Sequence, residues 1–247
     1  MTDSIKTAVI MAAGRGTRLK VRGEMAPKGF LQLGELPIIE ESILRLQAVG
    51  VGKIVIVTGH LAEFYEELAD RYSGLIRTVH NEDYADSGSM YSLYCAREAL
   101  DDEAFYLLES DLIYESRALQ VLRNRPESSV ILLSGITRSN DEVWVESGPD
   151  GRLLGMSKDP AALSSVPTGE LVGVSKLDGA AYRTLCGTAA KMFEESMHVE
   201  YEQALVAASG ITPIYCWKVE DLVWAEIDDE DHLARAREKI YPRIGKG

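Results

Sequence analysis

The sequence contains few cysteines and no long hydrophobic run, and both absences exclude classes of protein. Its 247 residues include 3 cysteines without C-x-x-C spacing, so neither a disulfide framework nor a zinc knuckle is expected. No stretch reaches the roughly 20 apolar residues of a transmembrane helix. The apolar run at residues 8–13 is too short for a signal peptide. We therefore expect an unprocessed, soluble protein of the reducing cytoplasm that does not contact a membrane.

Positive charge is scarce as well. The chain has 26 lysine and arginine residues against 39 aspartate and glutamate residues, which gives a net charge of −13. Such a charge opposes binding to nucleic acids and to anionic membrane surfaces. An anionic ligand would therefore have to meet a few locally placed cations or a metal ion.

Strands and helices alternate through the first half of the chain. Apolar runs predict strands at residues 7–11, 53–57, 75–79 and 104–108. Periodic apolar positions predict helices that end before Gly50 and that cover residues 61–72 and 90–100. This alternation is typical of a parallel sheet with crossover helices, so we expect an α/β protein.

The second half of the chain has a different pattern. The segment "VWVESGPDGRLLGM" predicts a hairpin that turns at Pro149, Asp150 and Gly151, between strands predicted in "SSVILLSG" and "ELVGVSKL". Two helices over residues 178–208, a strand at 214–217 and a terminal helix are expected to follow. We interpret residues 1–247 as one domain, with an antiparallel insertion or lid at about residues 135–178 that binds the second substrate.

The loop in "AVIMAAGRGTRL", residues 8–19, follows a strand that is apolar throughout. It lacks the third glycine of a dinucleotide fingerprint and the Gly-Lys-Ser/Thr of a P-loop. Its backbone N–H groups and guanidinium groups suit a triphosphate, although a simple tight turn is the alternative. Nearby, Pro27 keeps the preceding residue extended, so Lys28 can project back across the loop unless it is merely a solvated surface cation.

Two aspartates follow predicted strands. Asp111 comes directly after the strand at 104–108, and Asp228 follows "LVWAEI". Asp228 alone would be read as the N-cap of the last helix. If the two strands converge, both carboxylates would instead hold Mg²⁺, which prefers one or two carboxylates together with phosphate oxygens and water.

Taken together, these residues resemble the nucleoside-diphosphate-sugar pyrophosphorylase superfamily of nucleotidyltransferases. The resemblance rests on A-A-G-x-G-T-R-L followed by P-K, on "ESD", on "EIDDEDH" and on "MSKDP". It implies a Rossmann-like three-layer α/β/α fold with a mainly parallel central sheet. It also implies roles for the matching residues: base and sugar contacts at Ala12, Ala13 and Gly14, triphosphate contacts at Gly16, Thr17, Arg18 and Lys28, Mg²⁺ at Asp111 and Asp228, and the acceptor's phosphate at Lys158.

Within that superfamily the chain resembles small bacterial cytidylyltransferases that act on 2-aminoethylphosphonate or phosphocholine. A quaternary ammonium is expected to need a box of aromatic rings, whereas a primary ammonium has three N–H donors for carboxylates. The candidate rings are Trp144, Tyr84, Tyr91 and Tyr201, and the carboxylates around them are Asp141, Glu142, Glu200 and Glu202. We therefore expect transfer of CMP from CTP to 2-aminoethylphosphonate, with Trp144, Tyr201 and Glu202 binding the acceptor and phosphocholine as the alternative.

Several expectations complete this interpretation. Asn81 and Ser89 could contact the base or ribose, although Gly88 and Ser89 also read as a helix N-cap. A nucleotide-binding oxidoreductase and a catalytically silent nucleotide sensor are the alternatives from other classes. The CMP-aminoethylphosphonate product would serve the decoration of surface glycans or lipids, and a homodimer is the expected assembly.

Overall fold

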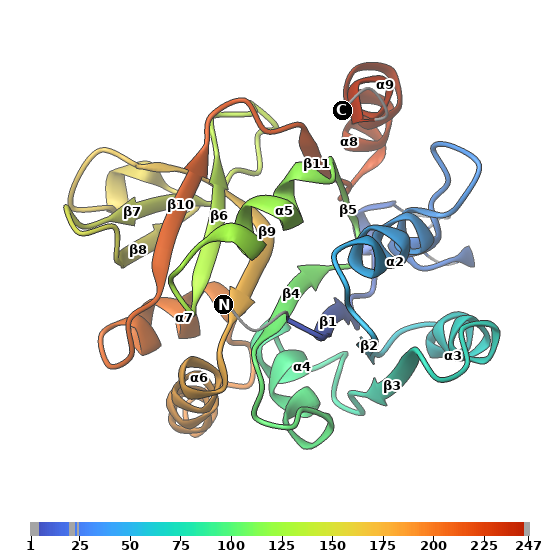
Figure 1. Ribbon diagram of the computed structural model, residues 1–247, viewed down its shortest axis with the longest axis horizontal. Helices are drawn as coiled ribbons and strands as arrows, with labels where there is room; N and C mark the ends of the chain where they lie inside the picture. Colours follow the sequence, from blue (N-terminus) through green and yellow to red (C-terminus); the bar gives the residue numbers. More distant parts are fainter. Residues whose placement is uncertain (1–4, 20–22, 24, 245–247) are drawn as a thin grey trace.

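The apolar run that ends in the glycine loop forms a strand at the centre of a mixed sheet. The computed structural model describes residues 5–19, 23 and 25–244. In this part of the chain the sheet has the strand order β10-β6-β9-β4-β1-β2-β3, which runs from left to right in Figure 1. These strands are β1 (Thr7–Ala12), β2 (Lys53–Thr58), β3 (Ile76–His80), β4 (Phe105–Glu109), β6 (Val130–Ser134), β9 (Gly169–Leu177) and β10 (Tyr215–Val219).

Most neighbouring strands are parallel, as the alternation of strands and helices predicts. β4, β1, β2 and β3 are parallel to one another, and β10 is parallel to β6. β9 is antiparallel to both of its neighbours, β4 and β6. The carboxyl ends of β1, β2 and β4 therefore meet at one edge of the sheet, where α/β proteins bind their ligands.

Helices cover both faces of the sheet, because successive side chains of a buried strand point to opposite faces. In β1, Ala8 and Ile10 pack into one core, whereas Val9 and Met11 pack into the other. The first core lies under α2 (Ile38–Ala48), α3 (Ala62–Arg71) and α5 (Arg117–Asn124). The second lies under α4 (Ser89–Cys95) with the 3₁₀ turn Ala96–Ala99, α6 (Gly179–Met192) and α7 (Tyr201–Ser209). The predicted three-layer arrangement is confirmed (Figure 1).

The predicted hairpin forms, but the strands of the region at residues 135–178 are part of the central sheet. β7 (Trp144–Ser147) and β8 (Leu153–Ser157) are antiparallel, and the turn between them places Gly151 at φ +81°. β7 pairs in turn with the start of β9, and a short 3₁₀ turn at Pro160–Ala162 follows β8. The hairpin therefore belongs to the same sheet, as a branch off its main strand path, and β9 itself lies between β4 and β6.

A second, two-stranded sheet connects the end of the chain to the ligand-binding edge. β5 (Leu112–Tyr114) and β11 (Trp224–Glu226) are antiparallel, and the N–H of Ile227 donates to the carbonyl of Asp111 over 3.1 Å. The helices that follow are α8 (Glu230–Arg235), a π-helical turn at Ala236–Ile240 and α9 (Tyr241–Ile244). They pack their apolar side chains against Ile38 at the start of α2.

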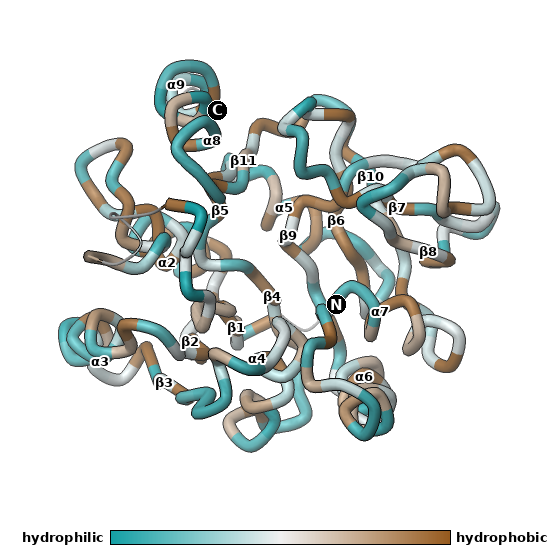
Figure 2. The backbone as a smooth tube through the Cα atoms, turned by 180° about the vertical axis from the view of Figure 1, so that it is seen from behind, coloured by the Kyte–Doolittle hydropathy of each residue, from teal (hydrophilic) through white to brown (hydrophobic). Residues whose placement is uncertain are grey.

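Apolar residues are concentrated inside this framework. Figure 2 shows hydrophobic colour along inner strands such as β6 and β9, and more hydrophilic colour on α3 and α8. None of the helices in the described part of the chain is both long enough and apolar enough to cross a bilayer.

Candidate active site

An open cavity of about 620 Å³ lies at the carboxyl ends of β1 and β4. Its walls come from the glycine loop, the start of α4, the segment that follows β4 and the start of α7. The predicted site residues that line it are Ala12, Ala13, Gly14, Gly16, Thr17, Arg18, Lys28, Ser89, Asp111, Lys158, Tyr201 and Glu202. Residues far apart in the sequence thus share one cavity, large enough for a nucleoside triphosphate.

Local backbone structure presents the two basic residues of the loop to this cavity. Gly16 has a φ of +62°, a conformation that favours glycine, and the 3₁₀ turn Thr17–Leu19 follows it directly. Pro27 is extended and precedes a second 3₁₀ turn, Lys28–Phe30. Lys28 consequently points back across the loop, as its place after a proline predicts.

The two predicted metal aspartates lie together around Lys28. The Lys28 Nζ is 2.8 Å from Asp111 Oδ2 and 2.5 Å from Asp228 Oδ1, and Arg18 lies 2.7 Å from the same oxygen of Asp228. Burial of the Lys28 ammonium opposes its charge, but the charges of Asp111 and Asp228 outweigh this effect and raise its pKa above the ordinary value. Lys28 is therefore a permanent cation at the centre of the site.

Asp228 is not a helix cap. The N-cap of α8 is Asp229, whose Oδ1 accepts the N–H of His232 over 2.8 Å. Asp228 is only 1% exposed, and its Oδ2 is buried without a hydrogen-bond partner among the described residues. The capping interpretation of Asp228 was wrong, since the position next to it fulfils that role.

The residues around Asp111 fit a hard divalent cation. Oxygens of Glu109, Asp111 and Glu226 lie within 4.8 Å of one another, and the unpartnered Oδ2 of Asp228 adds another free ligand atom. Burial, together with the charges of neighbouring carboxylates, raises the pKa values of Glu109 and Glu226. A cation here would relieve that repulsion.

The sequence interpretation missed Glu109 and Glu226, although a signal for them is present. Each lies two residues before a predicted metal aspartate, in "ESD" and in "EID". Alternate residues of an extended segment point to the same side. The repeated E-x-D pattern therefore predicts four carboxylates at one place rather than two.

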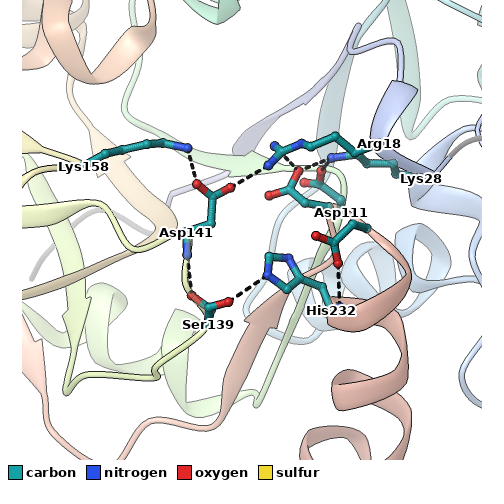
Figure 3. A network of polar contacts seen from close by, with 9 residues as sticks. Arg18, Lys28, Asp111, Ser139, Asp141, Lys158 and His232 are labelled. Atoms are coloured by element: carbon teal, nitrogen blue, oxygen red, sulfur yellow. Dashed lines mark hydrogen bonds and ion pairs between the residues drawn. The ribbon is translucent and has the colours of Figure 1, made fainter.

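Asp141 connects the glycine loop to the hairpin. Its Oδ2 accepts a hydrogen bond from Arg18 over 2.8 Å, and its Oδ1 accepts one from Lys158 over 2.5 Å. The two cations approach Asp141 from opposite sides in Figure 3. Burial opposes ionisation of Asp141, but the hydrogen bonds from Lys158 and Arg18 lower its pKa to about 2. The cations expected to bind phosphate groups are thus paired with a carboxylate.

A smaller and more enclosed cavity, of about 70 Å³, adjoins the first. The carboxylates that line it are Glu109, Asp141, Glu170, Glu202 and Glu226, and its cations are Lys158 and Arg235. Glu109, Lys158, Glu202 and Glu226 line both cavities, so the two spaces are direct neighbours. We call the smaller space the acidic cavity.

Glu202, in the wall of the acidic cavity, has unused hydrogen-bonding capacity. Its Oε2 is buried and has no partner among the described residues. Burial raises the pKa of Glu202 to about 7. Its neighbour Tyr201 is 3% exposed and donates its hydroxyl to Glu109 over 2.6 Å, so Tyr201 holds a second carboxylate in place.

Of three further predicted ligand contacts, Ser89 lines the larger cavity, whereas Asn81 and Trp144 line neither cavity. Asn81 is fully buried and donates its amide group to Ser87 Oγ and Ser92 Oγ, so it supports the cavity wall from behind. Ser89 is the first residue of α4 and donates its hydroxyl to Glu200 over 2.5 Å, which joins α4 to α7 while it lines the larger cavity. Trp144 lies in β7 and lines neither of the two cavities.

Gly88 is required for packing rather than for approach to a ligand. A Cβ at this position would lie 2.3 Å from the carbonyl oxygen of Val199. The same segments exchange backbone hydrogen bonds, from Gly88 N–H to Met197 and from Met90 N–H to Val199. Gly88 is the N-cap residue of α4, as the capping interpretation predicts.

Comparison with known proteins agrees with this geometry. Residues 8–147, which contain the glycine loop and Asp111, match the MobA-like NTP transferase domain. The chain belongs to this family. The predicted nucleotidyltransferase is thereby confirmed, and a nucleotide-binding oxidoreductase is not.

Relatives of this NTP transferase include cytidylyltransferases. It is 30% identical over 95% of its length to the CMP-5'-(3-aminopropyl)phosphonate synthase of Streptomyces rubellomurinus. It is 38% identical over 42% of its length to the choline-phosphate cytidylyltransferase of Streptococcus pneumoniae. The matched regions span 39% and 44% of those two proteins. The solved structure of CTP:phosphocholine cytidylyltransferase from Streptococcus pneumoniae is similar with a TM-score of 0.79 and 25% identity, over 95% of this chain and 98% of that one.

Proposed function

We propose that this NTP transferase moves CMP from CTP to 2-aminoethylphosphonate and releases pyrophosphate. The names of the relatives support a CTP-dependent transfer to a small phosphorus-containing acceptor. The observation that carries the choice of acceptor is the acidic cavity beside the paired aspartates, with the unpartnered Oε2 of Glu202 in its wall. A carboxylate without a donor in a cavity rich in carboxylates suits a ligand with a charged N–H group.

The two cavities divide the substrates between them. The glycine loop, with Gly16, Arg18 and Lys28, lines the larger cavity and offers N–H groups and cations to a triphosphate. Lys158 lies at the junction of the cavities, where it can bind the phosphonate group of the acceptor. The ammonium group of the acceptor then enters the acidic cavity.

The ion pairs at Asp141 are suited to exchange with a zwitterion. Asp141 forms ion pairs with Arg18 and Lys158. The phosphonate and triphosphate anions compete for these two cations, while the ammonium group brings a positive charge to the carboxylates left behind. When the acceptor binds, its phosphonate becomes the partner of the cations and its ammonium becomes the partner of the carboxylates. Few charges in the site are therefore left without a partner of opposite charge.

Transfer consists of in-line attack by a phosphonate oxygen on the α-phosphorus of CTP. A bond forms between these atoms, and the bond from the α-phosphorus to the bridging oxygen breaks, so pyrophosphate leaves with the electron pair. The phosphonate is already ionised near neutral pH, so no general base is required. Lys28 and Arg18 stabilise charge that moves toward pyrophosphate, and the loop and Lys158 orient the reactants. Mg²⁺ held by Asp111 and Asp228 would supply further charge neutralisation between the two anions.

The acidic cavity lacks a box for a quaternary ammonium. Among its described lining residues the aromatic rings are Trp224 and His232. Trp224 donates its indole N–H to Ser134 over 2.9 Å and belongs to the packed core. Trp144 is absent from the cavity wall, so cation–π contacts with several rings are not provided. The surrounding carboxylates favour a primary ammonium over trimethylammonium.

We expect kcat/KM with CTP to be about tenfold or more higher for 2-aminoethylphosphonate than for phosphocholine. Trimethylation removes every N–H donor, and each charge-assisted hydrogen bond contributes roughly 1.5–3 kcal/mol. A single cation–π contact would return only about 0.5–2 kcal/mol. Release of pyrophosphate, measured with both acceptors and with 3-aminopropylphosphonate, tests this. Equal efficiencies, or a preference for phosphocholine, would overturn the choice of acceptor, and UTP in place of CTP provides the nucleotide control.

A further inference from the structure

His232 lies in the wall of the acidic cavity with its protonation pattern fixed by one contact. Its Nε2 is 3.0 Å from the carbonyl oxygen of Ser139, as Figure 3 shows. A carbonyl oxygen can only accept a hydrogen bond, so the Nε2 atom carries the proton. In the tautomer with this single proton, the Nδ1 atom is a hydrogen-bond acceptor.

That acceptor is unused. The Nδ1 atom of His232 is buried and has no hydrogen-bond partner among the described residues, like the Oε2 atom of Glu202. Both residues line the acidic cavity. They come from different elements, α8 and α7. Two acceptors without a protein partner in one enclosed space can both receive N–H groups of a ligand, and buried polar groups in folded proteins are nearly always hydrogen-bonded.

Other polar groups of the cavity are already engaged. Glu170 accepts the backbone N–H and the hydroxyl of Thr137 over 2.7 and 2.8 Å. Arg235 donates to the carbonyl of Thr137 over 2.7 Å, and Lys158 donates to Asp141. The buried atoms of the lining without a partner are Nδ1 of His232 and Oε2 of Glu202, and both can accept N–H groups of a ligand that fills the space.

We propose that His232 is a specificity-determining residue for the acceptor: its Nδ1 and the Oε2 of Glu202 together receive two N–H groups of the acceptor's primary ammonium. This inference rests on the proposed function and adds a residue to it. Glu202 supplies a carboxylate oxygen, and the Nδ1 atom of His232 supplies a directed hydrogen bond. Glu202 and His232 thus discriminate between acceptors by the number of N–H donors on the nitrogen as well as by its charge.

If both atoms bind the ammonium, successive N-methyl groups on the acceptor lower kcat/KM by unequal factors. An N-methyl acceptor keeps two N–H groups and can satisfy both atoms, whereas an N,N-dimethyl acceptor keeps one and leaves an acceptor empty. We expect the larger fall in kcat/KM of the wild-type protein at the second methyl group. A single uniform fall with each methyl group would contradict a two-acceptor site.

The decisive test compares 2-aminoethylphosphonate with ethylphosphonate, which lacks the ammonium, in His232→Leu, His232→Asn and wild-type protein. We expect His232→Leu to lower kcat/KM for 2-aminoethylphosphonate by roughly ten- to a hundredfold, mainly through KM. The value for ethylphosphonate should change less than about threefold. His232→Asn places an amide oxygen near the position of Nδ1 and should restore most of the preference. His198→Leu, an exposed histidine outside both cavities, is the matched control.

The outcomes separate the two claims. If His232→Leu lowers the activity with both acceptors by the same factor, or if the asparagine variant is no better, His232 has a structural role only and the inference fails. If wild-type protein does not prefer 2-aminoethylphosphonate to ethylphosphonate, the proposed acceptor fails together with the inference. Should His232→Leu not fold, as judged by its far-UV spectrum and Tm, the asparagine variant and the methylation series still decide.

Discussion

Replacing Asp228 or Asp111 by asparagine is expected to lower kcat by at least about 10²-fold, the scale seen when one element of transition-state charge stabilisation is lost. Each substitution keeps the size of the side chain but removes a charge that faces Lys28 at 2.5 or 2.8 Å. It also removes one of the carboxylates that would hold Mg²⁺. The measurement is pyrophosphate release at saturating CTP, acceptor and Mg²⁺.

Asp229→Asn is the matched control for this prediction. Asp229 is adjacent in sequence to Asp228 but caps α8, and asparagine is an equally good N-cap residue. We expect this variant to keep nearly wild-type kcat. If Asp228→Asn or Asp111→Asn also stayed near wild-type activity with an unchanged far-UV spectrum, the two-aspartate metal site would be wrong.

Lys28→Ala is expected to lower kcat by about 10²- to 10³-fold, because a preorganised cation that faces the transferring and leaving phosphates matters most as charge redistributes. The lysine is also the partner of two buried carboxylates. Its loss leaves them to repel each other, so Tm should fall as well. Assays of kcat and thermal melts with and without Mg²⁺ measure both effects.

The response to Mg²⁺ distinguishes this role from a simple structural one. In Lys28→Ala the two carboxylates lack a counter-charge, so Mg²⁺ should raise the Tm of the variant more than that of the wild type. Lys191→Ala, at the exposed end of α6, should leave kcat and Tm nearly unchanged. If Lys28→Ala has a lower Tm but keeps wild-type kcat at a temperature at which it is folded, Lys28 has a structural role only.

Much of the fold follows from local patterns. The strand at Thr7–Ala12 is predicted by an apolar run, because a strand covered on both faces has no polar side. The turn at Gly151 is predicted by the turn-forming residues Pro149, Asp150 and Gly151. Its observed φ of +81° is one that glycine adopts readily. The place of β9 could not be predicted in the same way. Its pairing with β4 and β6 depends on long-range packing, which the hydrophobic periodicity and composition of the segment do not specify.

In the candidate site too, some residues were predicted from local patterns and others depend on long-range packing. The glycine loop, Lys28, Asp111 and Asp228 were predicted because each lies at a strand end or in a motif, and the structure brings them into one cluster. Trp144 was expected at the acceptor and lines neither cavity, since the register of β7 against β9 sets where its ring lies.

His232 gave no signal in the sequence. Its proposed role depends on the carbonyl of Ser139, which lies 93 positions away in the chain. In the loop that carries Ser139, Arg138 and Asn140 have φ values of +57° and +72°, which residues other than glycine rarely adopt. Nothing in the order of residues specifies that geometry.

Phosphorus NMR of the protein with CTP, Mg²⁺ and 2-aminoethylphosphonate decides whether CMP is transferred to the phosphonate, because it identifies the bond that is made. We expect pyrophosphate to appear in equal amount with a phosphonate resonance coupled to a phosphate phosphorus, the signature of a new P–O–P linkage. Consumption of CTP without that coupled signal, or formation of a coupled product from phosphocholine but from no aminoalkylphosphonate, would contradict it.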